Sequence, residues 1–169
     1  KIFLATKVGW DMGSYEHYYH PTHMRKQMEK SLINLQTDCV DLLYLHHCNF
    51  GKNGEYFDDA VETVRRFQSD GKTKFIGLSD WDSHKIMKFI ERCNPAVVQP
   101  YRNVWDDSYE LSGLKYYTEK NNIGVCFFSP IMHGLLTGKY FKPTIFEKGD
   151  FRENINAFKN QMIINKIRK

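Results

Sequence analysis

The feature that most constrains this chain is a repeated alternation of short apolar runs and longer amphipathic segments. Each run is apolar along its whole length rather than at every second residue, which is typical of strands buried on both faces of a parallel sheet. We therefore predict five parallel strands. They are IFLAT (2–6), DLLYL (41–45), KFIGL (74–78), AVVQ (96–99) and IGVCFF (123–128).

The segments between these runs have apolar residues at helical spacing. Thr22 and Ser83 are predicted to cap the first and third helices. DGK (70–72) and NNIG (121–124) are typical of turns from a helix into a strand. The four predicted helix faces are Met24, Met28, Leu32 and Leu35; Phe57, Ala60, Val61, Val64 and Phe67; Ile86, Phe89 and Ile90; and Leu111, Leu114 and Tyr117.

Strand and helix alternate without a glycine-rich phosphate loop after any strand, which argues against a dinucleotide-binding Rossmann half. The pattern favours successive βα units of a (β/α)8 TIM barrel. A complete barrel of this type has ~250 residues, and this chain has 169. We predict an α/β fold with a single domain over residues 1–169, an incomplete barrel of about five βα units. The units expected to be missing are at the N-terminal and C-terminal ends.

Charge and composition exclude several classes of function. The net charge is +4, and no basic stripe interleaved with aromatic residues is present, so we expect no nucleic-acid partner. No apolar run is long enough to span a bilayer, so we expect no membrane partner. The cysteines form no CxxC pair, which indicates reduced thiols in a cytoplasmic protein. They are Cys39, Cys48, Cys93 and Cys126.

Several residues that follow the predicted strands have chemically useful side chains, and barrels of this class carry their chemistry at the carboxyl ends of strands. Strand alternation places Lys7 and His46 on faces that we predict to reach the barrel mouth. Each also has a structural interpretation, Lys7 as a rim lysine reaching water and His46 as a hydrogen-bonded core histidine. His47 points the other way and is interpreted as structural. The other strand-end residues are Ser79, Asp80, Gln99, Phe128 and Ser129.

Five segments, in order, resemble the aldo-keto reductase superfamily from its third to its seventh barrel strand. They are IFLATKVG, SLINLQTDCVDLLYLHH, GKTKFIGLSDW, AVVQPYRN and GVCFFSPIMHGLLTGKY. The resemblance implies an NAD(P)H-dependent oxidoreductase that reduces aldehydes or ketones to alcohols. NADP is the expected cofactor, with NAD possible, and the expected partner is a small-molecule carbonyl substrate.

The resemblance also implies roles for individual residues. Lys7 matches the lysine that lowers the pKa of the family's catalytic tyrosine, and His46 matches the histidine that polarises the carbonyl group. Ser79 and Gln99 match residues that bind the nicotinamide carboxamide, and Phe128 matches the aromatic residue that stacks on its ring. Ser129, Ile131 and GLLTGK (134–139) match the loop beside the pyrophosphate.

Two positions depart from the family pattern. Asp80 occupies a cofactor-binding position where asparagine is usual, and its carboxylate can accept but not donate a hydrogen bond. A structural interpretation of Asp80 is the N-cap of the following helix. Arg102 lies near a usual tyrosine, and its role is left open.

The tyrosine and aspartate of the family mechanism belong to a segment expected to precede Lys1. Asp11, Tyr15, Tyr18 and Tyr19 are not taken as substitutes, because they follow the third strand of the family order. Tyr44 is interpreted as core packing.

Two other classes of function remain as alternatives. One is a non-catalytic nicotinamide-binding regulatory subunit similar to potassium-channel β-subunits. The other is a metal-dependent hydrolase, suggested by His17, His20 and His23 and by the His46–His47–Cys48 run. We disfavour the metal site because the three histidines are crowded in one loop, whereas barrel metal ligands come from several strand ends. That loop is interpreted as a lid near the substrate or as a surface loop.

Overall fold

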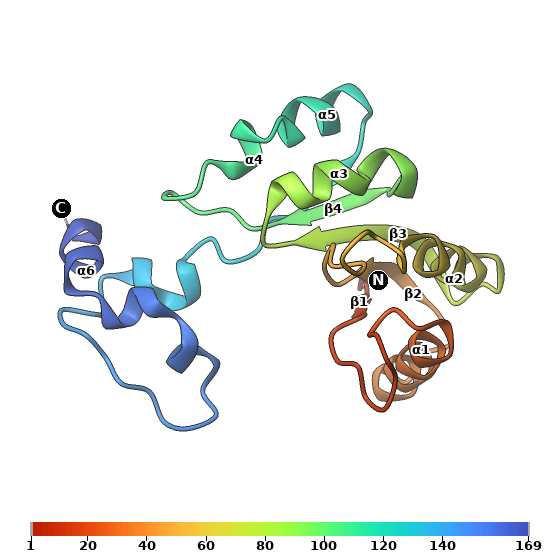
Figure 1. Ribbon diagram of the computed structural model, residues 1–169, viewed down its shortest axis with the longest axis horizontal. Helices are drawn as coiled ribbons and strands as arrows, with labels where there is room; N and C mark the ends of the chain where they lie inside the picture. The colour runs from red at the N-terminus through yellow and green to blue at the C-terminus, as the bar shows by residue number, and fades with distance from the viewer. Residues whose placement is uncertain (1, 169) are drawn as a thin grey trace. The chain divides into compact units, whose positions relative to one another are not determined.

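The computed structural model describes residues 2–168, and its centre is a parallel sheet of five strands. The strands lie in chain order, β1-β2-β3-β4-β5, and every neighbouring pair is parallel (Figure 1). This confirms the predicted α/β class, since parallel neighbours require a crossover between each pair. The bounds are β1 Ala5–Val8, β2 Val40–Leu45, β3 Thr73–Asp80, β4 Val97–Pro100 and β5 Gly124–Val125.

Helices follow the strands in the predicted order. The first three are α1 Pro21–Leu35, α2 Phe57–Ser69 and α3 Ser83–Cys93. Their apolar faces pack on one side of the sheet, where Met28, Val64 and Ile86 are fully buried with Leu43 and Leu78 of the strands. The helical spacing in the sequence therefore identified the faces that form this core. Leu35, which was predicted on the face of α1, is the exception, because it is 39% exposed at the end of the helix.

The predicted caps of two helices are wrong by one or two residues. The N-cap of α1 is His20, whose Nδ1 accepts a hydrogen bond from the Thr22 backbone N–H at 3.3 Å. The N-cap of α3 is Asp82, whose Oδ1 accepts from the His84 N–H at 2.9 Å. Because a cap needs extended backbone before the first turn, Thr22 and Ser83 already lie inside their helices.

The predicted fourth helix is in fact two short helices. They are α4 Ser108–Leu111 and α5 Leu114–Lys120. Gly113 separates them with a φ of 80°, a left-handed conformation that ends a right-handed helix. Leu111 is consequently 80% exposed and does not share a buried face with Leu114.

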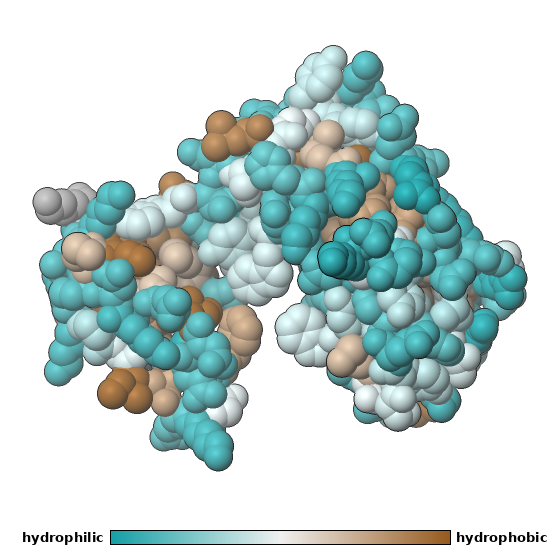
Figure 2. Space-filling view, in the orientation of Figure 1, coloured by the Kyte–Doolittle hydropathy of each residue, from teal (hydrophilic) through white to brown (hydrophobic). Residues whose placement is uncertain are grey.

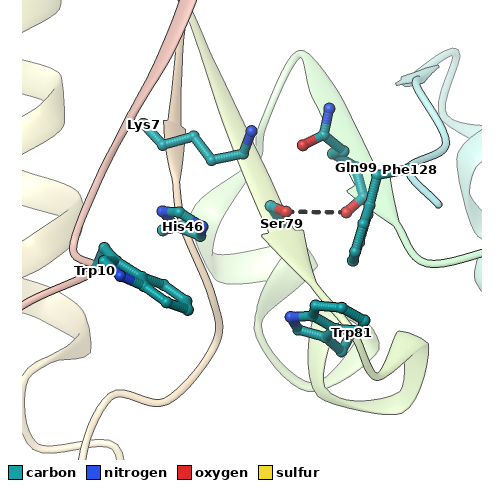
Figure 3. Close-up of a pocket in the computed structure, with 7 residues that line it drawn as sticks. All are labelled: Lys7, Trp10, His46, Ser79, Trp81, Gln99 and Phe128. Atoms are coloured by element: carbon teal, nitrogen blue, oxygen red, sulfur yellow. Dashed lines mark hydrogen bonds between the residues drawn. The ribbon is translucent and has the colours of Figure 1, made fainter. Parts of the chain in front are cut away.

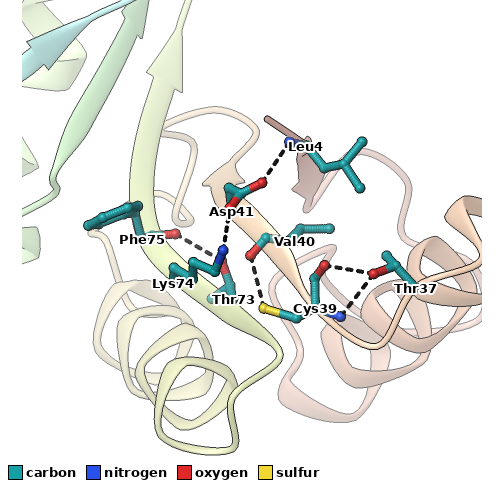
Figure 4. A network of polar contacts seen from close by, with 8 residues as sticks. All are labelled: Leu4, Thr37, Cys39, Val40, Asp41, Thr73, Lys74 and Phe75. Atoms are coloured by element: carbon teal, nitrogen blue, oxygen red, sulfur yellow. Dashed lines mark hydrogen bonds and ion pairs between the residues drawn. The ribbon is translucent and has the colours of Figure 1, made fainter. Parts of the chain in front are cut away.

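A polar network joins the first three strands at their amino ends (Figure 4). Asp41 Oδ2 accepts a hydrogen bond from the Leu4 N–H at 2.9 Å, and Asp41 Oδ1 pairs with Lys74 Nζ at 2.6 Å. The Asp41 carboxylate in β2 therefore contacts both the residue that precedes β1 and a residue of β3. Because both neighbours are anchored to the same side chain, the network favours the observed register.

By its contacts the chain divides into two compact units, where the sequence predicted one domain. The first unit runs to Tyr101 and includes Asp107–Phe128; the second contains Arg102–Asp106 and the residues from Ser129 onward. The second unit has its own small core around Leu135, Phe158 and Ile164. Its elements are the 3-10 helices η1 Met132–Thr137, η2 Phe151–Asn154 and η3 Asn156–Lys159, and α6 Gln161–Ile167.

The surface in view is mostly hydrophilic, interrupted by separate apolar side chains (Figure 2). Large apolar residues with high exposure include Ile33, Leu111 and Ile145. Within residues 2–168, no helix combines the length and the apolar character needed to cross a membrane.

Candidate functional site

A pocket of about 190 Å³ lies at the carboxyl ends of the strands in the first unit (Figure 3). It brings together five of the predicted site residues, contributed by β1, β3, β4 and the segments that follow β2 and β5. They are Lys7, His46, Ser79, Gln99 and Phe128. Trp10 and Trp81 also line the pocket and were not among the predicted site residues. Their positions in the sequence could have identified them, because each tryptophan closely follows a predicted strand-end residue.

Lys7 reaches the pocket from β1, and its amine lies over a neighbouring ring. Lys7 Nζ is 5.3 Å from the centroid of the Tyr44 ring on β2. Burial lowers the pKa of the Lys7 ammonium, and the nearby Cys126 thiol opposes that shift. A lysine in this position carries a charge that is only partly solvated and is available to a group inside the pocket.

His46 follows β2 and is held by its backbone, whose N–H donates to the Val8 carbonyl at 2.9 Å. Its ring lies 4.7 Å from the Trp10 ring, centroid to centroid. Burial lowers the pKa of the His46 imidazole to about 4, and the charges of Lys7 and His47 add to this effect. The imidazole is therefore neutral near pH 7 and has one N–H to donate.

His47 lies on the other side of the strand, as predicted. It is buried, and its carbonyl accepts a hydrogen bond from the Tyr19 hydroxyl at 2.5 Å. Its Nδ1 accepts from the Asn49 N–H at 3.3 Å. These contacts belong to the packing behind the sheet and not to the pocket.

Ser79, Gln99 and Phe128 form the opposite side of the pocket from Lys7 and His46 (Figure 3). The Ser79 hydroxyl is nearly buried and donates to the Gln99 backbone carbonyl at 3.1 Å, which leaves its oxygen free to accept a second hydrogen bond. The Phe128 ring meets Trp81 edge to face, with centroids 4.9 Å apart and planes at 89°. This side therefore combines a hydroxyl, an amide and an aromatic wall.

Asp80 is not among the residues that line the pocket, and it is not the N-cap of α3, as its structural interpretation expected. Its role toward a cofactor stays a prediction. Its carboxylate is 3% exposed and lies on the face of β3 opposite to Ser79. Oδ2 accepts from the Cys48 N–H at 2.6 Å, and Oδ1 accepts from the Asp82 N–H at 2.8 Å. Asp80 thus joins the end of β3 to the loop that follows His46, and the helix cap is Asp82.

The remaining predicted cofactor residues lie in the second unit. The Ser129 Oγ and the His133 Nε2 are 3.2 Å apart, and Ser129 has a left-handed φ of 58°. Ile131 is 53% exposed. Arg102 belongs to the same unit. Their roles toward a cofactor stay predictions.

His17, His20 and His23 do not all lie in one loop, as was expected: His17 is in the loop, His20 is the N-cap of α1, and His23 belongs to the first turn of α1. Each of the three has a structural partner. The His17 ring stacks on Tyr56 with centroids 3.9 Å apart, and His20 caps α1. His23 Nε2 contacts the Asp11 carbonyl at 2.7 Å. No three histidine, cysteine, aspartate or glutamate side chains within residues 2–168 are placed to hold a metal ion together.

Known proteins share this sequence pattern over the whole chain. The sequence model of the Aldo/keto reductase family matches residues 1–169. The chain is 29% identical over 182 residues to Aldo-keto reductase yakc of Schizosaccharomyces pombe, covering 100% of this chain and 52% of that protein. It is 28% identical over 147 residues to L-glyceraldehyde 3-phosphate reductase of Escherichia coli, covering 83% and 42%. The chain therefore spans about half the length of these curated relatives.

Solved structures give the same picture. A glycerol dehydrogenase from Gluconobacter oxydans superimposes with a TM-score of 0.76 at 29% identity, covering 99% of this chain and 52% of that one. The five parallel strands correspond to part of a (β/α)8 barrel, which confirms the predicted fold class.

Proposed function

The chain belongs to the aldo/keto reductase family, and we propose that its pocket is the carbonyl-reducing site of an NAD(P)H-dependent oxidoreductase. The proposed reaction converts aldehydes or ketones into alcohols. One observation carries the proposal: a lysine and a neutral histidine face a hydroxyl, an amide and an aromatic ring across one small pocket.

The second side of the pocket fits a nicotinamide. A carboxamide needs both donors and acceptors, and the Ser79 hydroxyl and the Gln99 side-chain amide supply them. The Phe128 ring offers a flat apolar surface for the pyridine ring. When bound, the nicotinamide would supply the hydride, and the protein supplies its placement.

The first side of the pocket suits a carbonyl oxygen that gains negative charge. The neutral His46 imidazole can donate one hydrogen bond to that oxygen without adding a charge. The Lys7 ammonium stabilises the developing alkoxide. It also lowers the pKa of a nearby acid, and that acid protonates the alkoxide. Buried polar groups of this kind act strongly because little water competes with them.

The family mechanism assigns the proton to a tyrosine. Of the pocket-lining residues that the structure describes, none is a tyrosine. Tyr19, one of the tyrosines considered above, is fully buried and donates to the His47 carbonyl, which leaves it no role in the pocket. The chain spans about half the length of its curated relatives. The carbonyl-reducing activity and the tyrosine that donates the proton are therefore proposed for the whole protein.

The names of the relatives support the finer points. The name of the S. pombe relative includes NADP(+), which supports NADP as the cofactor. The E. coli relative is named as a reductase of an aldehyde, which supports the carbonyl substrate class. A non-catalytic subunit similar to potassium-channel β-subunits is not favoured, because these relatives are named as reductases.

The proposal is tested on the whole protein by titrating NADPH or NADH into it and then adding aldehydes and ketones, following the loss of the reduced cofactor's absorbance. Lys7→Met and His46→Leu should each slow reduction by at least ~100-fold, the usual contribution of an acid–base group. Lys115→Met removes an exposed lysine of α5 and serves as the matched control. Cofactor binding without any reduction by the unaltered protein would favour the regulatory alternative, and absence of both NADPH and NADH binding would reject both.

A further inference from the structure

We propose that the Tyr44 ring is a positioning residue that holds the Lys7 ammonium at the pocket, and that position 77 is glycine in order to seat that ring. The three residues come from three neighbouring strands. The part that this arrangement plays in carbonyl reduction rests on the function proposed above.

The three residues form one rung across the sheet. Lys7 pairs with Tyr44 in the parallel register of β1 and β2, and Tyr44 pairs with Gly77 in the register of β2 and β3. Paired residues on a sheet project from the same face, so all three positions share the face that leads to the pocket. Tyr44 occupies the middle position, and a ring lying flat there takes up space above Lys7 or Gly77.

Gly77 provides that space. A Cβ atom at this position would lie 2.3 Å from Tyr44 Cδ1 and 2.5 Å from Tyr44 Cε1, which is far inside contact distance. Gly77 lies in the interior of β3, where glycine weakens a strand relative to other residues. It has none of the positive φ values that make glycine necessary at turns. The reason for glycine here is therefore the close approach of the Tyr44 ring.

The ring in turn contacts Lys7. Nζ lies 5.3 Å from the ring centroid, within the range at which an ammonium is attracted to an aromatic face. Tyr44 is 3% exposed, so the contact is poorly screened by water. Burial raises the pKa of the Tyr44 hydroxyl to about 12, so the ring acts as a neutral partner.

Among residues 2–168, two other titratable side chains affect this site. His46 lies beyond the end of β2, and its imidazole is neutral near pH 7. The Cys126 thiol follows β5 and is close enough to affect Lys7 and Tyr44. Burial disfavours the charged amine, and the aromatic face of Tyr44 offsets part of that cost while it holds the Lys7 ammonium in place.

The test is an NMR titration of Lys7 in protein carrying ¹³C- and ¹⁵N-labelled lysine, with Lys7→Met identifying its signal. Tyr44→Leu keeps an apolar side chain but removes the ring face, so we expect the Lys7 pKa to fall by about 0.4 to 1.5 units. Tyr44→Phe keeps the face and should restore a value within about 0.3 units of the unaltered protein.

Gly77→Ala should displace the ring and lower the Lys7 pKa in the same direction. In the double variant, the Lys7 pKa should be no lower than in Tyr44→Leu alone, because the ring that the added methyl group of Gly77→Ala would displace is already absent. If Gly77→Ala does not fold, Tyr44→Leu and Tyr44→Phe still decide the question. Leu42→Ala removes a buried side chain from the same face of β2 and controls for general destabilisation, with no shift expected.

Two results would overturn the inference: an unchanged Lys7 pKa in Tyr44→Leu, or an equal fall in Tyr44→Phe and Tyr44→Leu. The readout needs no turnover. An expected shift in a protein that fails to reduce carbonyls would therefore reject the proposed function and leave the Tyr44 contact standing.

Discussion

At the scale of single residues, the surroundings of His46 determine its chemical state. The ring is half-buried beside a lysine, and the pKa of the imidazole falls to about 4. The pocket therefore presents a neutral hydrogen-bond donor over the physiological range, which suits the proposed contact with a carbonyl oxygen.

The lowered His46 pKa predicts a pH dependence of stability. The unfolded chain binds a proton at His46 near its ordinary pKa of 6.5, and the folded chain does so only near 4. The free energy of unfolding should therefore fall as the pH is lowered through this window. His46→Gln should weaken that dependence in urea unfolding at several pH values. Leu42→Ala removes a buried side chain that does not titrate, so it should lower stability by the same amount at every pH; an unchanged pH dependence in His46→Gln would contradict the prediction.

Asp80 gives a second prediction at this scale. Its carboxylate accepts from two backbone N–H groups, whereas asparagine has one oxygen and turns its NH₂ toward the other N–H. Asp80→Asn should therefore lower the free energy of unfolding by about 1 to 3 kcal/mol.

Asp82→Asn is the matched control, because asparagine caps a helix about as well as aspartate. Urea unfolding of both variants distinguishes the two sites. Tighter binding of the reduced cofactor by Asp80→Asn without loss of stability would instead support a role for Asp80 in the pocket.

At the scale of elements, the boundary between α4 and α5 depends on one glycine. Gly113 has a φ of 80°, and a Cβ there would meet no heavy atom within 4 Å. Gly113→Ala should therefore cost only backbone strain, about 1 to 2 kcal/mol. Gly113→Asn should cost less, since asparagine tolerates this conformation. Thermal unfolding compares the two, and a gain in stability with alanine would indicate that the helices fuse.

The same elements show why helix prediction succeeded in three cases and failed in the fourth. Spacing alone identified the buried faces of α1, α2 and α3, because each is long enough for several turns to meet the sheet. The spacing of Leu111 and Leu114 was too short a pattern to reveal that the helix breaks at Gly113. The backbone conformation of Gly113 determines that break. The caps were missed because His20 and Asp82 act through local geometry that spacing does not describe.

At the scale of the whole molecule, the two units have separate cores. Phe158 is fully buried among residues of the second unit, and Phe50 is buried in the first. Phe158→Ala should therefore reduce hydrogen-exchange protection in the second unit while leaving the amides of β2 and β3 protected. Phe50→Ala should have the reverse effect. Equal loss of protection in both units after either change would show a single cooperative core.

The sequence by itself determined the parallel sheet, the order of the βα units and five residues of the pocket. It could do so because apolar periodicity and strand alternation are local properties, and in a barrel wall the strand ends converge. Only the tertiary structure decided which way Asp80 turns, what Gly77 makes room for, and that Trp10 and Trp81 join the site. Those outcomes depend on contacts between segments far apart in the chain, which compete for the same hydrogen bonds and the same volume.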